Sequence, residues 1–139
     1  MTPLYAQDRD YSAFSVLAVD DIPLNLLLVQ KMLSRFNFRL RTASGGQQAL
    51  DAVAAEKPDL ILLDLMMPNI DGFEVIRRLR ADAATADIRI VILSALNSQD
   101  DIVKGFSIGA DDFITKPIIM EKLLSSVLTQ IQLVEARRK

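Results

Sequence analysis

Residues 60–80 read LILLDLMMPNIDGFEVIRRLR, and this stretch predicts a buried strand, a loop and an amphipathic helix in succession. The apolar run at 60–63 ends at Asp64, which is typical of a parallel strand that is covered on both faces. A polar loop follows, and residues 73–80 then place apolar side chains at helical spacing. The centre of the chain is therefore a strand–helix unit with a carboxylate at the carboxyl end of its strand.

The same pattern extends outward in both directions. We expect further strands at 14–19, 38–43, 88–93 and 113–115, and further helices at 23–36, 46–56, 99–107 and 120–134. Strict alternation of strands and helices indicates a parallel sheet with helices on both faces. The strand at 38–43 alternates in polarity and the strand at 113–115 is short, as at the edges of a sheet. Right-handed crossovers then favour the strand order 2-1-3-4-5.

The composition excludes several classes of function. The 139 residues suit one domain, and 50% of them are hydrophobic and 24% charged, as in a globular fold. The chain has no Cys and no His, which excludes disulfides, thiolate or imidazole metal sites and histidine-based catalysis. Its net charge of −2 gives no basic footprint for direct nucleic-acid binding. No apolar run is long enough to cross a membrane, so we expect no membrane contact and a cytoplasmic location.

Polar residues follow the strands that meet where the winding of this sheet reverses. Asp20 and Asp21 follow the first strand, Asp64 the third, Ser94 the fourth and Lys116 the fifth. Each has an ordinary explanation when it is considered alone, such as a helix cap, a turn or a solvated loop. Ligands of open α/β sheets bind beyond the carboxyl ends of the strands at this reversal. Together the five residues therefore indicate one site.

The chemistry of these side chains points to phosphoryl transfer. Strands in a sheet lie about 4.8 Å apart, so three crowded carboxylates need a cation to remain ionised. With oxygen ligands alone, the expected ion is Mg²⁺, and Mn²⁺ is able to substitute. Asp64 is central and is the candidate nucleophile for an aspartyl phosphate, while Lys116 would neutralise the transferred group.

Four segments carry a resemblance to a known family. They are VLAVDD at 16–21, the stretch at 60–80, VILSA at 91–95 and GADDFITKPI at 109–118. In this order and spacing, the chain resembles the receiver domain of bacterial two-component response regulators over roughly residues 14–134. The resemblance implies a phosphoprotein of phosphorelay signal transduction with a flavodoxin-like, doubly wound, five-stranded parallel sheet.

The resemblance also implies a role for each site residue. Asp64 would be the phosphoacceptor, and Mg²⁺ would be held by Asp21 directly, by Asp20 mainly through water, by Asp64 and by the backbone carbonyl of Met66. Contacts to the phosphoryl group would come from the Lys116 ammonium, the Ser94 hydroxyl and the Ala95 backbone amide. Ser94 and Phe113 would form the switch, although Phe113 lacks the hydroxyl of the tyrosine that is common there. The Lys116–Pro117 peptide is expected to be cis.

The expected partners follow from the same reasoning. The chain has no His and no nucleotide-binding motif, so we expect a histidine kinase or a histidine phosphotransferase to supply the phosphoryl group. The protein would then be no enzyme beyond its own phosphorylation and dephosphorylation. The surface of the helix at 99–107, the strand at 113–115 and the helix at 120–134 would change shape and bind a second copy or an effector. Ile118, Ile119 and Met120 are consecutive, so at least one should be exposed there.

Two alternatives remain open at this stage. A haloacid dehalogenase-type, Mg²⁺-dependent phosphohydrolase also uses a strand-end Asp, but it needs a second Asp where this chain has Met66. A receiver-like scaffold that takes no phosphate is the other alternative. For the domain boundaries, we expect a mobile tail at 1–13, the receiver domain at 14–134 and a charged end or linker start at 135–139.

Overall fold

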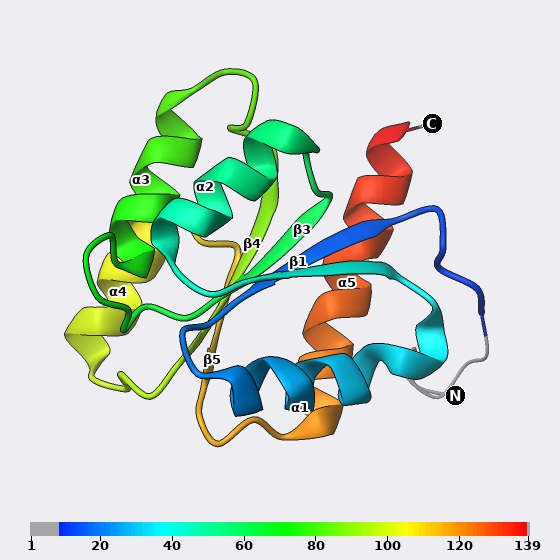
Figure 1. Ribbon diagram of the computed structural model, residues 1–139, viewed down its shortest axis with the longest axis horizontal. Coiled ribbons are helices and arrows are strands. Elements are labelled where there is room, and N and C mark those ends of the chain that lie inside the picture. The colour runs from blue at the N-terminus through cyan, green and yellow to red at the C-terminus, as the bar shows by residue number, and fades with distance from the viewer. Residues whose placement is uncertain (1–8, 139) are drawn as a thin grey trace.

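The computed structural model describes residues 9–138 and shows a five-stranded parallel sheet in the order β2-β1-β3-β4-β5 (Figure 1). The strands are β1 (Ser15–Val19), β2 (Arg39–Ala43), β3 (Leu60–Leu63), β4 (Arg89–Ser94) and β5 (Asp112–Thr115). The predicted fold class and strand order are confirmed. The winding reverses between β1 and β3, where the sequence places the site.

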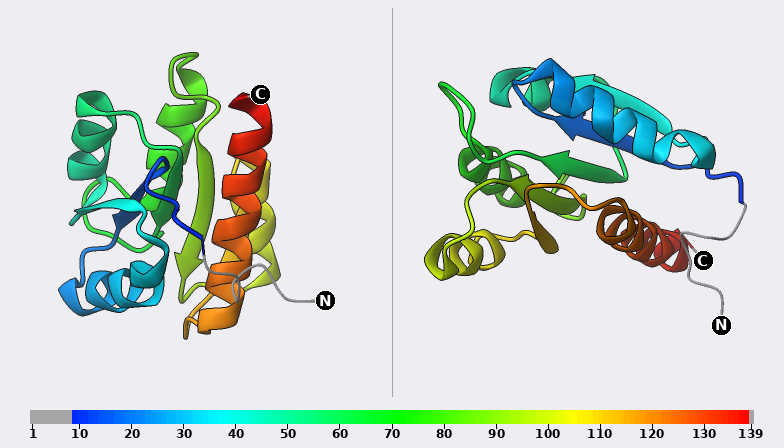
Figure 2. Two further views of the ribbon diagram at one scale, coloured as in Figure 1. Left: turned by 90° about the vertical axis from the view of Figure 1, so that its right-hand side faces the viewer. Right: turned by 90° about the horizontal axis from the view of Figure 1, so that it is seen from below.

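Helices cover both faces of the sheet (Figure 2). They are α1 (Pro23–Leu33), a 3₁₀ turn η2 (Ser34–Phe36), α2 (Gly46–Ala55), α3 (Gly72–Ala81), α4 (Gln99–Ser107) and α5 (Met120–Arg138). Helices α1 and α5 lie on one face, and α2, α3 and α4 lie on the other. Among the described residues, no helix is long and apolar enough to span a membrane.

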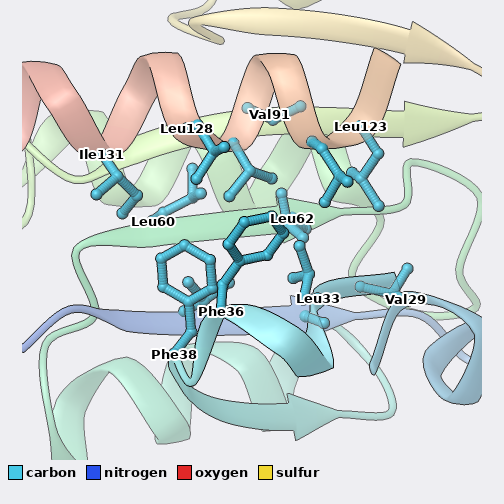
Figure 3. Packing of buried hydrophobic residues seen from close by; sticks show 14 of the residues in the cluster. Val29, Leu33, Phe36, Phe38, Leu60, Leu62, Val91, Leu123, Leu128 and Ile131 are labelled. Carbon is cyan, nitrogen blue, oxygen red and sulfur yellow. The ribbon is translucent and has the colours of Figure 1, made fainter. Parts of the chain in front are cut away.

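Two hydrophobic clusters fill the space between the sheet and its helices, because successive strand side chains point to opposite faces. Leu60 and Leu62 of β3 belong to the cluster under α1 and α5, which Figure 3 shows. Ile61 and Leu63 belong to the cluster under α2 and α3. The central strand is therefore buried on both faces, as its unbroken apolar run predicts.

Two helices differ from their predicted ranges. The regular turns of α1 end at Leu33, and η2 continues to Phe36, where Asn37 adopts a positive φ of 61° and ends the segment. Helix α5 continues to Arg138, beyond the predicted end at 134. Arg138 is held there by an ion pair with Asp59 at 2.7 Å, which the apolar periodicity of the helix cannot indicate.

Part of the expected N-terminal tail belongs to the packed domain. Residues 1–8 lie outside the described part of the chain, but Tyr11 is only 3% exposed. Its ring stacks on Phe38 with centroids 5.1 Å apart, and its backbone amide donates to the carbonyl of Phe36 at 2.8 Å. The segment from Tyr11 to β1 therefore packs against the domain, because the Tyr11 ring contacts Phe36 of η2 and Phe38, which directly precedes β2.

Candidate functional site

The carboxyl ends of β1 and β3 bring three carboxylates together. Val19 and Leu63 are register partners, so Asp20 and Asp64 leave the sheet at the same level. One carboxylate oxygen from each of Asp20, Asp21 and Asp64 lies within 4.8 Å of the others. The structure therefore assembles the acidic cluster that the strand ends predict.

Asp20 is fixed by three donors. It is 6% exposed, and its Oδ1 accepts a hydrogen bond from the backbone amide of Ile22 at 2.9 Å. Its Oδ2 accepts from Asn25 Nδ2 and from Lys116 Nζ, each at 3.0 Å. Sequence reasoning missed Asn25, although a polar residue in the first turn of an otherwise apolar helix is a usable signal.

Asp64 is a buried carboxylate with a weak hydrogen bond. It is 5% exposed, and its Oδ1 accepts a weak hydrogen bond from the Met66 amide at 3.3 Å. Burial raises the pKa of Asp64 above its ordinary value, the Lys116 ammonium opposes this rise, and the Asp20 carboxylate adds to it. The negative charge at this position is therefore incompletely neutralised by the protein.

Lys116 is the ion-pair partner of both buried carboxylates within the described residues. Its Nζ lies 3.0 Å from Asp20 Oδ2 and 3.9 Å from Asp64 Oδ1. Its backbone amide donates to the Ser94 carbonyl at 2.8 Å, which holds the end of β5 beside β4. The Lys116–Pro117 peptide is cis, as predicted.

The glycine at the start of α3 lets the loop after Asp64 fold back closely. A Cβ atom on Gly72 would lie 2.5 Å from the backbone oxygen of Asp64 and 2.7 Å from Leu65 Cα. The Gly72 amide donates to the Leu65 carbonyl at 3.1 Å, and the Asp71 carboxylate caps α3 by accepting from the Glu74 amide at 2.9 Å. These contacts hold the loop that contains Met66 against the acidic cluster.

The other predicted site residues lie at the same edge but outside the cluster. Ser94 is fully buried, and its Oγ accepts from the Leu96 amide at 3.1 Å, so its hydroxyl is engaged within its own loop. Ala95 is exposed beside it. Phe113 is half-buried and lies next to Ile92, its register partner on β4.

The donor set of the cluster fits a hard cation. It consists of carboxylate oxygens, two of the three carboxylates are buried, and burial disfavours the charge on Asp64. A divalent cation bound among these oxygens would offset that cost, and Mg²⁺ is the common ion with this preference. Asp20, Asp21 and Asp64 are therefore able to hold such an ion.

The surface around β5 is apolar in part, as predicted. Ile119 and Met120 are 47% and 49% exposed, whereas Ile118 is partly buried against the cluster under α1 and α5. The expectation that at least one of the three is exposed is confirmed. The exposed residues of the three are therefore Ile119 and Met120. Val103 and Phe106 of α4 are exposed as well.

A second apolar surface was missed. Helix α1 buries Val29 and Leu33, yet the side chains of Leu24, Leu27 and Leu28 on its outer side are 61%, 46% and 46% exposed. Beside this stripe, a groove of about 480 Å³ runs between α1 and the segment after β5, with Asp20 and Lys116 in its wall. The apolar stripe thus borders the acidic cluster directly.

Comparisons with known proteins agree with this geometry. Residues 16–128 match the model of the response regulator receiver domain family. The response regulator PleD of Caulobacter vibrioides is 42% identical over 121 residues, which are 86% of this chain and 27% of PleD. The regulator RpaA of Synechocystis is 41% identical over 81% of this chain and 46% of its own. The chain spans 27–48% of the length of such curated relatives.

A solved structure gives the same result for the fold. The BeF₃-activated receiver domain of DrrB superposes with a TM-score of 0.78 at 28% identity, covering 86% of this chain and 97% of that one. The match of the family model includes the acidic cluster, Ser94 and Lys116. This chain belongs to the response regulator receiver domain family.

Proposed function

We propose that Asp64 accepts a phosphoryl group and that this modification switches the surface formed by α4, β5 and α5. The observation that carries the proposal is the cluster itself. A buried carboxylate with a raised pKa lies within 4.8 Å of two others and 3.9 Å from an ammonium. A divalent cation would stabilise this arrangement by neutralising the carboxylates, and the anionic oxygens of a phosphoryl group would pair with Lys116.

The metal site of the proposal consists of the carboxylates of Asp20, Asp21 and Asp64 and the backbone carbonyl of Met66. A Mg²⁺ ion bound there supplies charge neutralisation for the transferred phosphoryl oxygens. Asp20 is held in place by the Ile22 amide and Asn25 before any ion binds. The chain therefore orients its own ligands.

The transfer itself is a displacement at phosphorus. A carboxylate oxygen of Asp64 forms a bond to phosphorus, and the bond from phosphorus to the donor atom breaks, so that the donor leaves with its electron pair. Lys116 moves from its pairing with Asp20 to the phosphoryl oxygens. The Ser94 hydroxyl leaves the Leu96 amide and donates to the same group, with the Ala95 amide beside it.

The donor must come from another protein or a small molecule, because this chain has no His. We propose a histidine kinase or a histidine phosphotransferase that docks on the outer stripe of α1. Leu24, Leu27 and Leu28 offer that donor an apolar contact surface, and Leu28 lines the groove that contains Asp20 and Lys116. The chemistry is limited to the domain's own phosphorylation and dephosphorylation, since Met66 stands where a phosphohydrolase needs its acid.

The phosphorylated state is proposed to act through the exposed residues around β5. Val103, Phe106, Ile119 and Met120 give this face an apolar surface beside the charged Glu121 and Lys122. When Ser94 moves toward the phosphoryl group, the inward position of the Phe113 ring is stabilised and the outline of α4 and β5 changes. A second copy or an effector then binds this face.

Phosphate incorporation tests the proposal. Incubation with acetyl phosphate and Mg²⁺ should add one acid-stable, base-labile phosphate, detected as a mass increase of the intact protein. Asp64→Asn should abolish it, and incorporation that survives this substitution would place the nucleophile elsewhere. Sedimentation with and without beryllofluoride, repeated for Ile119→Glu, tests the output surface. If Ile119→Glu changed neither self-association nor effector binding, this face would not be the output surface.

A further inference from the structure

Gly105 lies in the middle of α4 and is the buried residue of that helix. A glycine within a helix is less favourable than alanine, so this position requires a packing reason. A Cβ atom at residue 105 would lie 2.9 Å from Ile92 Cδ1 and 3.1 Å from Phe113 Cδ2. The missing side chain leaves a space, here called the Gly105 notch, into which the side chains of β4 and β5 extend.

The ring of Phe113 is confined on three sides. Ile92, its register partner, is fully buried, and Ser94 on the same strand is fully buried two residues further on. Helix α4 closes the third side at Gly105. The open side faces a groove of about 610 Å³ between β5 and α5, which Thr115 also lines. This groove therefore offers free volume to a ring that leaves the notch.

Helix α4 is held against the rest of the fold on the side away from β5. Lys104 Nζ lies 4.1 Å from the centroid of the Phe73 ring on α3. Arg80 Nε donates at 2.9 Å to the carbonyl of Gly109, which follows the helix. These contacts resist a shift of α4 away from the sheet, so crowding at residue 105 acts on the ring.

We infer that Gly105 is a positioning residue for Phe113, because the space left by its missing side chain seats the ring against α4. The inference rests on the proposed function, in which the ring position described here, against Gly105, is the inward one that the phosphorylated state favours. A larger residue at 105 therefore favours the outward ring and opposes the switch.

The effect of Gly105→Ala separates into two parts. The gain in helix stability is the same for both ring positions, so it leaves their balance unchanged. The added methyl group crowds Ile92 in both ring positions, but it crowds the ring only in the inward one. Overpacking of a filled site by one methyl group shifts such a balance by about tenfold. The beryllofluoride concentration at half-response should rise by this factor.

The experiment compares four variants of the full chain. They are Gly105→Ala, Phe113→Leu, the double variant and Ser107→Ala, which changes an exposed residue of the same helix and serves as the control. Beryllofluoride with Mg²⁺ is titrated by amide NMR. In parallel, ¹⁹F NMR of fluorophenylalanine-labelled protein reports the Phe113 ring, whose resonance the Phe113→Leu variant identifies.

Gly105→Ala should raise the half-response concentration about tenfold and move the ring resonance toward its solvent-exposed value. Ser107→Ala should behave as the wild type, and adding Gly105→Ala to Phe113→Leu should change nothing further. If Gly105→Ala alone failed to fold while Gly105→Ala combined with Phe113→Leu folded, the crowding of the Phe113 ring would be supported in the same way. An unchanged half-response, or an equal loss in the Phe113→Leu background, would overturn the inference. A wild type that ignores beryllofluoride would refute the proposed function, while the ring resonance would still decide on the notch.

Discussion

Replacing Asp64 with asparagine should make the metal-free protein more stable at neutral pH. Asp64 is buried, and its carboxylate lies within 4.8 Å of those of Asp20 and Asp21. Lys116 Nζ, at 3.9 Å, is its one ion-pair partner within the described residues. Asparagine keeps the shape of the side chain and removes the charge.

The magnitude follows from these separations. At an effective dielectric constant of about 20, a unit charge pair at 4–5 Å interacts by about 3–4 kcal/mol. Two repulsions of this size face one attraction, and burial adds a desolvation cost to the charged form. Relaxation and water reduce the net effect, so we expect Asp64→Asn to raise the free energy of unfolding by about 1–2 kcal/mol. For a chain of this length, that corresponds to a melting temperature about 3–8 °C higher.

The pH dependence has a defined sign. The pKa of Asp64 is raised in the folded protein, so the folded state keeps this proton to a higher pH than the unfolded chain does. The protonated Asp64 carboxyl contributes its full stabilisation of the wild type at pH values below the pKa of Asp64 in the unfolded chain. This stabilisation is lost as the pH rises through the folded pKa. The advantage of Asp64→Asn should therefore be absent in acid and develop as the pH rises through that folded value.

Calorimetric melting in the presence of a chelator, at several pH values, measures this effect. Asp51→Asn, which changes an exposed carboxylate of α2, is the matched control and should shift the melting temperature little. Saturating Mg²⁺ should stabilise the wild type more than the Asp64→Asn variant, so the difference between their melting temperatures should become smaller. If Asp64→Asn lowered the metal-free melting temperature at neutral pH, the electrostatic account of the site would be wrong.

Three further substitutions probe the metal site, the mobile cation and the N-terminal segment. Asp21→Ala should remove most of the thermal stabilisation by Mg²⁺, measured by calorimetry because the chain has no Trp; an undiminished gain would exclude Asp21 as a ligand. Lys116→Ala should keep the fold yet lose the phosphorylation-dependent NMR changes of α4 and α5, and wild-type changes would remove Lys116 from the mechanism. Tyr11→Ala should lower the unfolding free energy by about 3 kcal/mol in urea titrations without affecting phosphate incorporation. A decrease in unfolding free energy below about 0.5 kcal/mol would show that the aromatic contacts of Tyr11 contribute little to stability.

The acidic cluster could be predicted because the sheet does most of the positioning. Asp20 and Asp64 each follow an apolar run, and parallel strands carry the residues after such runs to one edge. The same logic places Lys116 there through β5. The prediction required only the positions of the strands and their order in the sheet. The apolar runs and the strict alternation of strands and helices indicate both clearly in this chain.

Features that depend on contacts between distant segments could not be predicted. The burial of Tyr11 depends on Phe36 of η2 and on Phe38 just before β2, which contact it only in the folded chain. The run of Ile118, Ile119 and Met120 predicts that at least one is exposed, but only the packing of Ile118 against the cluster under α1 and α5 shows which. The reason for Gly105 becomes visible only when α4 lies against β5.

The two edges of the sheet differ in how completely their charges are satisfied. At the carboxyl edge, one ammonium serves two buried carboxylates, and the pKa of Asp64 is raised. A bound cation or phosphoryl group changes this balance by several charges at once. Under the proposed function, we therefore expect the contacts of Lys116 to rearrange.

At the opposite edge of the sheet, ion pairs and hydrogen bonds join β4 and β5 to α3 and α5. Asp111, at the start of β5, pairs with Arg80 of α3 at 3.0 Å and with Arg89 of β4 at 3.1 Å. Its Oδ2 also accepts from the Ile90 amide at 2.8 Å, and Arg89 Nε donates to Gln130 of α5 at 2.7 Å. Breaking one partner of such a network leaves a partly buried charge uncompensated, which costs several kcal/mol. Under the proposed function, we therefore expect phosphorylation of Asp64 to leave Asp111 and its partners in place and to change α4, the end of β5 and the start of α5.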